Sequence, residues 1–260
     1  MNIAERLAKY EERGFGRETA AVNVLLEETL QILFASFPDS FVFFGGASLV
    51  LFYGSPRHSG DLDLLITDEI PPSADELQKV LEQPLRAAVE VLGFENLAIE
   101  HARATGEFLK LAVRAGEQVL FTIDLTRISA VIRSELVAFP IAPDSAEQIT
   151  VPSLPLQLLF KAEAFLNRPF LKARDAFDIK LLRDSGAMLD DNLKAHLLDG
   201  HAGEKLENPE FITRRIDQVN SRTCKPDLQP YLPRNVYDEL EKVDFEPLRQ
   251  ALRELFSEWL

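Results

Sequence analysis

The feature of this sequence that most limits its possible folds is a change of hydrophobic pattern at a proline-rich segment. Before that segment, short apolar runs typical of strands alternate with helical patterns, and after it the apolar residues recur only at helical spacing. Proline interrupts helices and central strands alike. We therefore predict an α/β domain with a mixed sheet over residues 1–150 and an all-helical domain over residues 151–260. The prolines that mark the boundary are Pro140, Pro143, Pro152 and Pro155.

The same patterns locate the individual elements. Gly45-Gly46 is predicted to form a turn after a buried apolar strand, and Gly116 a tight hairpin. The helices predicted in the first domain span 2–13, 17–37, 47–53 and 74–92, and the strands 41–44, 61–66, 96–103, 107–114, 118–126 and 134–141. Those predicted in the second domain span 154–167, 171–185, 189–199, 208–221 and 244–259, with a loop at Pro226, Pro230 and Pro233.

Composition excludes several classes of protein. The chain has 28 Lys and Arg against 42 Asp and Glu, a net charge of −14. This balance argues against a protein that coats nucleic acid, so DNA is not an expected partner. The single cysteine, Cys224, allows no disulfide within the chain and favours the cytoplasm. The longest uncharged stretch, Ser40 to Pro56, is too short and too rich in glycine to cross a membrane.

Three aspartates form the candidate metal site. Asp61 and Asp63 are two residues apart on a predicted strand, so their carboxylates point the same way while Leu62 and Leu64 face the core. Asp124 is the one carboxylate of a later apolar strand. Carboxylate oxygens are the protein ligands that Mg²⁺ prefers, together with substrate phosphates. Three such groups predict a site for Mg²⁺, or Mn²⁺ in its place, that binds a phosphorylated substrate.

The glycine pair suggests where the phosphates would lie. Gly45 and Gly46 allow close approach of a ligand to the backbone, and Ser48 lies at the start of a predicted helix. The N-terminus of a helix attracts anions. We therefore expect these residues to contact a triphosphate.

These motifs together resemble a known superfamily. Gly-Gly, then a gap, then Asp-x-Asp, then a strand Asp resembles the polymerase-β-like nucleotidyltransferases. The long gap, with Arg57 and Ser59 before Asp61, resembles the AbiEii/AbiGii toxin family, which includes MenT-like toxins. The blocks Pro152–Arg168 and Lys172–Ile179 are similar to the Lys-centred helix and the Arg-Asp-x-x-Asp helix of that family. The resemblance covers residues 40–183.

The resemblance implies a function and a set of site residues. It implies an Mg²⁺-dependent nucleotidyltransferase that moves a nucleotide from an NTP to an acceptor hydroxyl, with tRNA as the expected acceptor, and a toxin with a cognate antitoxin. The helical domain would complete the active site. The implied catalytic residues are Asp61, Asp63, Asp124, Lys161 and Asp178. The implied nucleotide contacts are Gly45, Gly46, Ser48, Arg57, Ser59, Lys161, Arg174 and Asp175.

Some alternatives stay open. The sequence does not decide between Asp175 and Asp178, although we favour Asp178 as the catalytic one. Residues 161–183 and 211–225 each carry a net charge of +3, which fits an RNA acceptor. The acidic balance instead favours a cationic small molecule, as for an antibiotic nucleotidyltransferase. A non-catalytic nucleotide-binding protein is the third reading.

Overall fold

The structure is a computed structural model and describes residues 2–67, 71–105, 108–127, 133–140, 148–200 and 202–260. The chain forms two compact units, Met1–Pro152 and Ser153–Leu260. The division falls two residues after the expected position, because strand β7 (Gln148–Pro152) contacts β1 and belongs to the first unit. Each unit is described separately.

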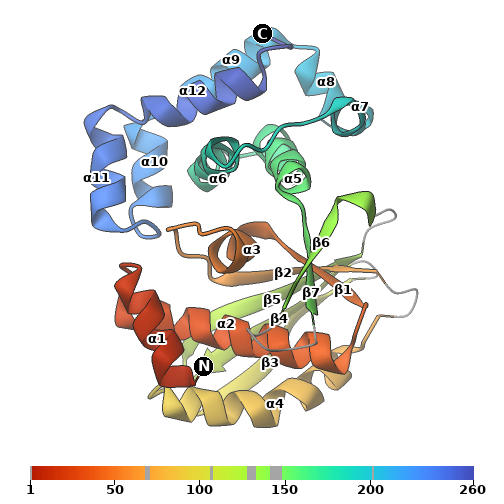
Figure 1. Cartoon of the computed structure of the whole chain (residues 1–260), viewed down its shortest axis with the longest axis vertical. Coiled ribbons are helices and arrows are strands. Elements are labelled where there is room, and N and C mark those ends of the chain that lie inside the picture. Colours follow the sequence, from red (N-terminus) through yellow and green to blue (C-terminus); the bar gives the residue numbers. More distant parts are fainter. Residues whose placement is uncertain (1, 68–70, 106–107, 128–132, 141–147, 201) are drawn as a thin grey trace. The chain divides into compact units, whose positions relative to one another are not determined.

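The first unit is built on a five-stranded mixed sheet (Figure 1). Its central pair, β2 and β5, is parallel, while each remaining neighbour is antiparallel. The order across the sheet is β1 (Phe41–Phe44), β2 (Asp61–Ile66), β5 (Gln118–Arg127), β4 (Phe108–Ala115) and β3 (Leu97–Ala104). The predicted α/β class is therefore confirmed.

One face of this sheet carries the core. Alternate residues of β2 and β5, such as Leu62 and Ile123, are fully buried there beneath helices α2 (Arg17–Ser36) and α4 (Ala74–Val91). The two helices pack side by side (Figure 1). The residues between these buried ones point to the other face of the sheet, and in β2 and β5 they include the aspartates.

Helix α4 begins with Ser73 as its N-cap. The Ser73 hydroxyl accepts a hydrogen bond from the Glu76 N–H, and the Glu76 carboxylate accepts one from the Ser73 N–H. Hydrogen bonds from the Ser73 hydroxyl and N–H lower the pKa of Glu76. This reciprocal arrangement satisfies donors that the helix cannot pair internally.

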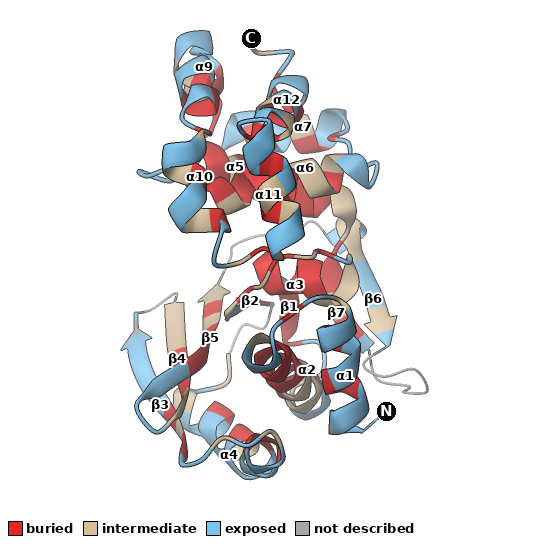
Figure 2. Ribbon diagram, turned by 90° about the vertical axis from the view of Figure 1, so that its left-hand side faces the viewer, coloured by how far each residue is buried: buried red, intermediate tan, exposed pale blue. Residues whose placement is uncertain are grey.

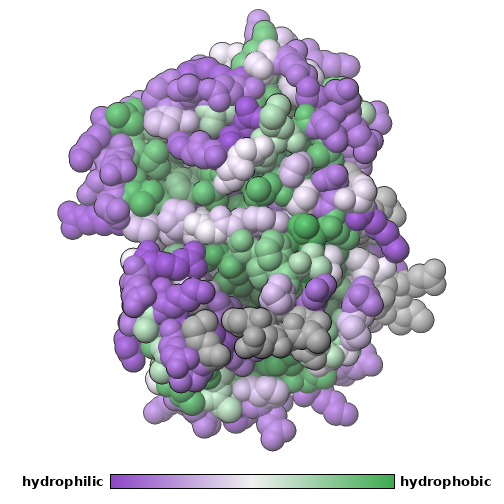
Figure 3. Space-filling view, in the orientation of Figure 1, coloured by the Kyte–Doolittle hydropathy of each residue, from purple (hydrophilic) through white to green (hydrophobic). Residues whose placement is uncertain are grey.

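Smaller elements complete the first unit. Helix α1 (Ile3–Glu12) packs on α2 and turns a mostly hydrophilic surface outward (Figure 3). Arg13, which follows it, donates hydrogen bonds to the carbonyls of Val50 and Ser55. Strand β6 (Leu136–Pro140) pairs with β7 in an antiparallel hairpin. Arg13 thus joins the N-terminal helices to the segment that leads from β1 to β2.

The second unit is entirely helical in the residues described. Helices α5 (Leu154–Asn167) and α6 (Ala173–Asp184) are each buried along more than half of their length and pack against each other (Figure 2). The surrounding helices are α7 (Asp191–Asp199), α8 (Gly203–Leu206), α9 (Pro209–Asp217), α10 (Ser221–Leu228), α11 (Arg234–Lys242) and α12 (Glu246–Leu255). Among the described helices of the whole chain, none has the length and apolar character that a membrane span requires.

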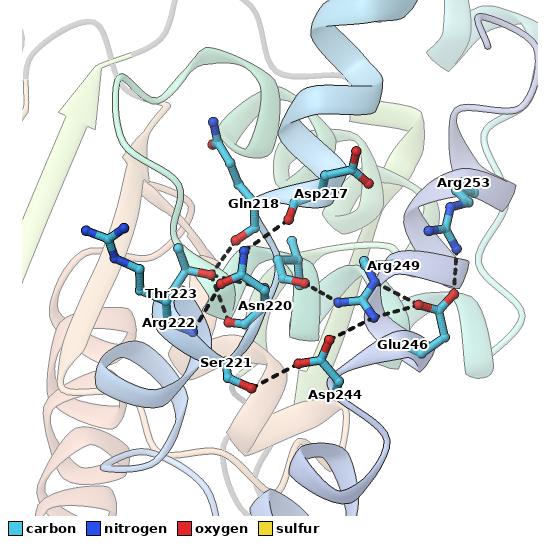
Figure 4. A network of polar contacts seen from close by, with 11 residues as sticks. Asp217, Gln218, Asn220, Ser221, Arg222, Thr223, Asp244, Glu246, Arg249 and Arg253 are labelled. Carbon is cyan, nitrogen blue, oxygen red and sulfur yellow. Dashed lines mark hydrogen bonds and ion pairs between the residues drawn. The ribbon is translucent and has the colours of Figure 1, made fainter.

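A polar network joins the turn between α9 and α10 to the start of α12 (Figure 4). The Arg249 guanidinium donates to the Val219 carbonyl at 2.6 Å and pairs with Glu246 at 2.7 Å and Asp244 at 3.4 Å. Ser221 donates to the same Asp244 carboxylate. Arg249 therefore connects the loop at Val219, between α9 and α10, to the loop at Asp244, before α12.

The structure corrects several predicted boundaries. Gly45 and Gly46 start helix α3 (Gly45–Phe52) instead of forming a separate turn. The predicted helix 208–221 ends earlier, as α9 at Asp217, and α10 starts at Ser221. The predicted proline loop begins later, after the end of α10 at Leu228, and extends to Pro233. Pro226 lies inside α10, where it removes only one backbone hydrogen bond, and Pro233 is the N-cap of α11, where its missing N–H has no helical acceptor.

The buried face of β5 can be tested against an exposed position of the same strand. We expect Leu125→Ala, at a fully buried site, to lower the free energy of unfolding by about 2–5 kcal/mol through lost burial and the cavity left behind. Val119→Ala, at a position 45% exposed, should change it little. Urea unfolding of both variants measures this difference, and equal losses would contradict the assigned core.

Candidate active site

The candidate site begins where β1 ends and β2 starts. Phe44, the last residue of β1, is paired with Asp63, and α3 follows directly at Gly45. Gly45 has a φ of +78°, and a Cβ placed there would lie 2.1 Å from Asp63 Oδ2. The Asp63 carboxylate therefore lies against the first residue of the helix. Only glycine provides both this conformation and this space.

Gly46 is enclosed from another direction. A Cβ at Gly46 would lie 2.3 Å from Arg57 Nη2 and 2.8 Å from Ser59 Oγ. Both side chains are buried, and Arg57 Nη1 donates to the His58 carbonyl at 2.9 Å. The Gly-Gly pair, Arg57 and Ser59 are thus parts of one packed cluster around the start of α3.

Ser48 has a local role in this structure. Its side chain is fully buried, and its hydroxyl donates to the Gly45 carbonyl at 2.8 Å. This bond supports the first turn of α3. The three residues expected to contact nucleotide here, Gly45, Gly46 and Ser48, therefore all lie in the first turn of α3.

The three predicted aspartates lie on two neighbouring strands. Parallel pairing of β2 with β5 places Asp63 directly opposite Asp124 and Asp61 opposite Thr122. The Thr122 hydroxyl donates to Asp61 Oδ1 at 2.8 Å and so orients that carboxylate. Asp61 is exposed, whereas Asp63 and Asp124 are partly buried. The side chains of all three lie on the sheet face opposite α2 and α4.

Asp124 has a cationic neighbour that the sequence did not predict. Lys110 of β4 is paired in register with Asp124, and its ammonium lies 2.8 Å from the carboxylate. Lys110 alternates with Leu109 and Leu111 along its strand, which could have marked it as a polar-face residue. The sequence does not predict that Asp124 is the partner of Lys110, because a bulge between Val113 and Arg114 shifts the register of the hairpin.

Asp61 and Asp63 fit a hard divalent cation. They supply two carboxylates from one strand face, beside the N-terminus of α3, and Mg²⁺ typically uses one or two protein carboxylates with substrate phosphates and water. Within the described part of the chain, no group of three or more acidic, histidine or cysteine side chains is arranged to hold a metal ion.

A second charged cluster lies between α5 and α6. Lys161 is buried, and its ammonium lies 2.8 Å from Asp178 Oδ2 and 3.4 Å from Asp175 Oδ1. Arg168 pairs with the other oxygen of Asp175 at 2.9 Å, and half of its side chain is exposed. Asp178 is completely buried. Burial of these charges requires such pairing, because an unpaired charge in the interior is strongly unfavourable.

The end of α5 is held by two further cations. Arg215 donates to the carbonyls of Phe165 and Arg168, at 2.9 and 2.7 Å, and Lys205 donates to the Leu166 carbonyl at 3.1 Å. Burial lowers the pKa of Arg215, and the charge of Asp175 opposes this shift. Cations at a helix C-terminus satisfy its unpaired carbonyls and favour its dipole.

Arg174, the remaining predicted nucleotide contact, is engaged with α10 and the loop beyond it. Its guanidinium lies 3.3 Å from Asp227 and over the Tyr231 ring, 4.3 Å from the centroid. Its backbone N–H also donates to Asp227. These contacts favour a role in packing α6 within the second unit.

Comparison with known families gives one match. The model of the family described as "Nucleotidyl transferase AbiEii toxin, Type IV TA system" matches residues 30–258. A search of curated proteins gives no match. The family match covers both units, including the second-unit residues after 183 for which the sequence motifs gave no resemblance.

Three solved structures share the fold. A protein from H. pylori assigned as a nucleotidyltransferase is 17% identical, with a TM-score of 0.63 over 94% of this chain and 97% of that one. JHP933 from Helicobacter pylori is 16% identical, with a TM-score of 0.59 over 94% of each chain. MenT4, a nucleotidyltransferase toxin from Mycobacterium tuberculosis, is 17% identical, with a TM-score of 0.55 over 100% of this chain and 93% of that one.

The close approach of Asp63 to Gly45 can be tested with a glycine that has the same backbone conformation. Gly54 has a φ of +70° and no atom within 4 Å of an added Cβ. Gly54→Ala should therefore lose only about 1–2 kcal/mol of stability, from backbone strain. Gly45→Ala should lose more, because the Asp63 carboxylate must also move. Urea unfolding compares the two, and equal losses would refute the contact.

The buried ion pair of Lys161 predicts a large effect on stability. We expect Lys161→Met to lower the free energy of unfolding by about 3–5 kcal/mol, because it leaves Asp178 buried without that cation. Adding Asp178→Asn should recover part of the loss. Arg234→Ala is the control, since Arg234 pairs with Asp238 at 3.7 Å on the surface and should contribute little. Chemical denaturation would contradict the assignment if Lys161→Met behaved like the control.

Proposed function

The chain belongs to the AbiEii nucleotidyl transferase toxin family of type IV toxin–antitoxin systems, and from this we propose that it transfers a nucleotide from an NTP to a hydroxyl group of tRNA. The observation that carries the proposal is the meeting of Asp61, Asp63 and the start of α3 at one edge of the sheet. Carboxylates beside a helix N-terminus can bind a metal-bound triphosphate.

The proposed reaction is an in-line displacement. The acceptor hydroxyl oxygen attacks the α-phosphorus of the NTP and forms a new P–O bond. The bond between the α-phosphorus and the bridging oxygen breaks, and pyrophosphate leaves with the electron pair. The hydroxyl proton is lost to solvent. Catalysis of such a transfer depends mainly on positioning and on neutralising phosphate charge.

In the first unit, the proposal assigns metal binding to Asp61 and Asp63. Mg²⁺ held there, or Mn²⁺ in its place, would neutralise the phosphates and the leaving pyrophosphate. Thr122 orients Asp61 through its hydrogen bond. Gly45, which has no Cβ, leaves room for the Asp63 carboxylate at the start of α3. Arg57 and Ser59 support the backbone of Gly46, which would face the triphosphate.

In the second unit, the proposal gives Lys161 and Arg168 the phosphate-binding charges. The Arg168 side chain is 49% exposed, whereas that of Lys161 is 10% exposed. Asp178 is fully buried and lies 2.8 Å from Lys161. This favours a positioning role for Asp178 over direct contact with the acceptor. Asp175 contacts both cations and would set their separation.

The support for an RNA acceptor is electrostatic. Of the basic residues in 211–225, Arg215 is buried, whereas Arg214, Arg222 and Lys225 are exposed. Exposed cations in an otherwise acidic chain are a surface on which an RNA backbone can bind. We propose this group as the first to examine for tRNA binding, and the family implies an antitoxin as the protein partner.

The proposed function is tested by transfer of label. Each α-labelled NTP is incubated with Mg²⁺ and total tRNA, using wild type, Asp63→Asn and Asp199→Asn. Asp63→Asn should lower transfer by more than about 100-fold, since even residues behind metal ligands contribute roughly 10–100-fold. Asp199 is exposed on α7 and serves as a matched control with unchanged transfer.

The outcomes separate the candidate functions. Label on tRNA that is lost in Asp63→Asn supports the proposal, and expression of wild type alone should then slow growth. Pyrophosphate release without labelled tRNA indicates another acceptor, such as a cationic small molecule attracted by the acidic chain. NTP binding without pyrophosphate release in the presence of tRNA would indicate a binding protein and contradict the proposed transfer.

A further inference from the structure

An aromatic side chain of the second unit points into solvent. Phe170, in the loop between α5 and α6, is 80% exposed, the largest fraction among the exposed large apolar side chains of the described residues. All other phenylalanine, tyrosine and tryptophan residues are buried or partly buried. Because burial of a phenyl ring is favourable, a ligand that covers Phe170 would gain binding free energy.

The loop that carries Phe170 is anchored at both ends. The Arg168 carbonyl accepts a hydrogen bond from Arg215 at 2.7 Å, and Arg168 Nε lies 2.9 Å from Asp175 Oδ2. At the other end, the Lys172 carbonyl accepts a hydrogen bond from the Asp175 N–H at 3.0 Å. A loop that is already fixed loses little conformational freedom when a ligand binds to it.

Cations flank the aromatic ring along the sequence. Arg168 lies two residues before Phe170 and has a side chain that is 49% exposed, and Lys172 lies two residues after Phe170 and is also exposed. The Arg168–Lys172 loop contains no acidic residue, although the chain as a whole has a net charge of −14. An anionic ligand is therefore favoured at this loop over a cationic one.

An exposed ring between two cations is the combination with which proteins bind single-stranded nucleic acid. The ring stacks on the face of a base, and the cations contact the phosphates of the backbone. Stacking requires an unpaired base, because the face of a base inside an RNA helix is already covered by its neighbours. Protein interfaces instead deplete charged residues around their buried aromatic residues. The surroundings of Phe170 therefore favour RNA over a protein partner.

The same loop is connected to the charged cluster between α5 and α6. Arg168 pairs with Asp175, whose other carboxylate oxygen lies 3.4 Å from Lys161 Nζ. Lys161 and Arg168 are the residues to which the proposed function gives phosphate-binding charges. An RNA base on Phe170 would thus lie close to the second-unit part of the candidate active site.

We propose that Phe170 stacks on an unpaired base of the RNA acceptor, with Arg168 and Lys172 contacting the phosphates beside that base. This inference rests on the proposed function for the RNA itself. It adds that the second unit recognises a single-stranded part of the acceptor, and that stacking on one aromatic ring contributes to the affinity.

The test measures binding of a short end-labelled single-stranded RNA, and of the same RNA annealed to its complement, by fluorescence anisotropy. Phe170→Ala should weaken binding of the single strand by about 5- to 150-fold, the range for loss of one base–aromatic stack. Binding of the duplex should not change. Phe170→Trp should retain the affinity, whereas Phe170→Leu, which is apolar but has no aromatic face, should not.

The salt dependence separates stacking from charge. Phe170→Ala should leave the slope of log affinity against log salt concentration unchanged, whereas Lys172→Gln should reduce its magnitude by about 0.7, the value for one phosphate contact with a single strand. Met188→Ala is the matched control, because Met188 is an apolar residue of the same unit that is 67% exposed. This variant should bind both RNAs as wild type does.

Several results would overturn the inference. These are single-strand binding by Phe170→Ala equal to that of wild type, an equal loss for the duplex, or no binding of the single strand by wild type. Weaker binding of an NTP with unchanged RNA affinity would place the donor base on Phe170 and would also overturn it. If Phe170→Ala does not fold, Phe170→Leu provides the same comparison.

These measurements use no NTP hydrolysis or transfer, so they are independent of the label-transfer assay. Binding of RNA that depends on Phe170, without label on tRNA, would leave this inference standing and defeat the proposed function. Label transfer to tRNA with the same KM for tRNA in wild type and Phe170→Ala would support the proposed function and overturn this inference.

Discussion

Parallel pairing of β2 with β5 is the constraint on which the candidate site depends. It places Asp63 beside Asp124 and lets Thr122 orient Asp61. Because β1 is antiparallel to β2, the end of β1 and the start of α3 arrive at the same edge. A shift of one residue would turn these carboxylates into the core and Leu62 and Leu64 outward, so burial of the opposite face maintains the register.

In both units, aspartates of the candidate site are paired with lysines. Asp124 is matched by Lys110 in the first, and Lys161 is matched by Asp178 and Asp175 in the second. These pairs are partly or fully buried, so each charge needs its partner. The same pairs restrict how the residues can act in a reaction. A fully buried Asp178 can hold Lys161 in place, whereas Asp61, which is exposed, can contact a ligand directly.

Sequence reasoning succeeded where the pattern was local. The helices of the first unit and the strand 61–66 follow from periodicity, and the structure contains all of them. It was wrong where tertiary contacts outweighed local signals. Helix α10 extends through Pro226 into the segment that the prolines predicted as a loop, and the glycine pair predicted a turn that is the first turn of a helix. Strand β7 was missed because its partner β6 lies across the proline-rich segment.

By itself, the sequence determined the α/β class, the change to helices near residue 150, and which residue types gather as candidate ligands. These depend on periodicity and on side-chain chemistry, which are properties of short segments. Only the tertiary structure decided which charges meet. The bulge in β5 pairs Lys110 with Asp124, and the packing of α5 on α6 buries Lys161 between two aspartates. Such partners depend on register and on packing between distant segments, and no local pattern encodes either one.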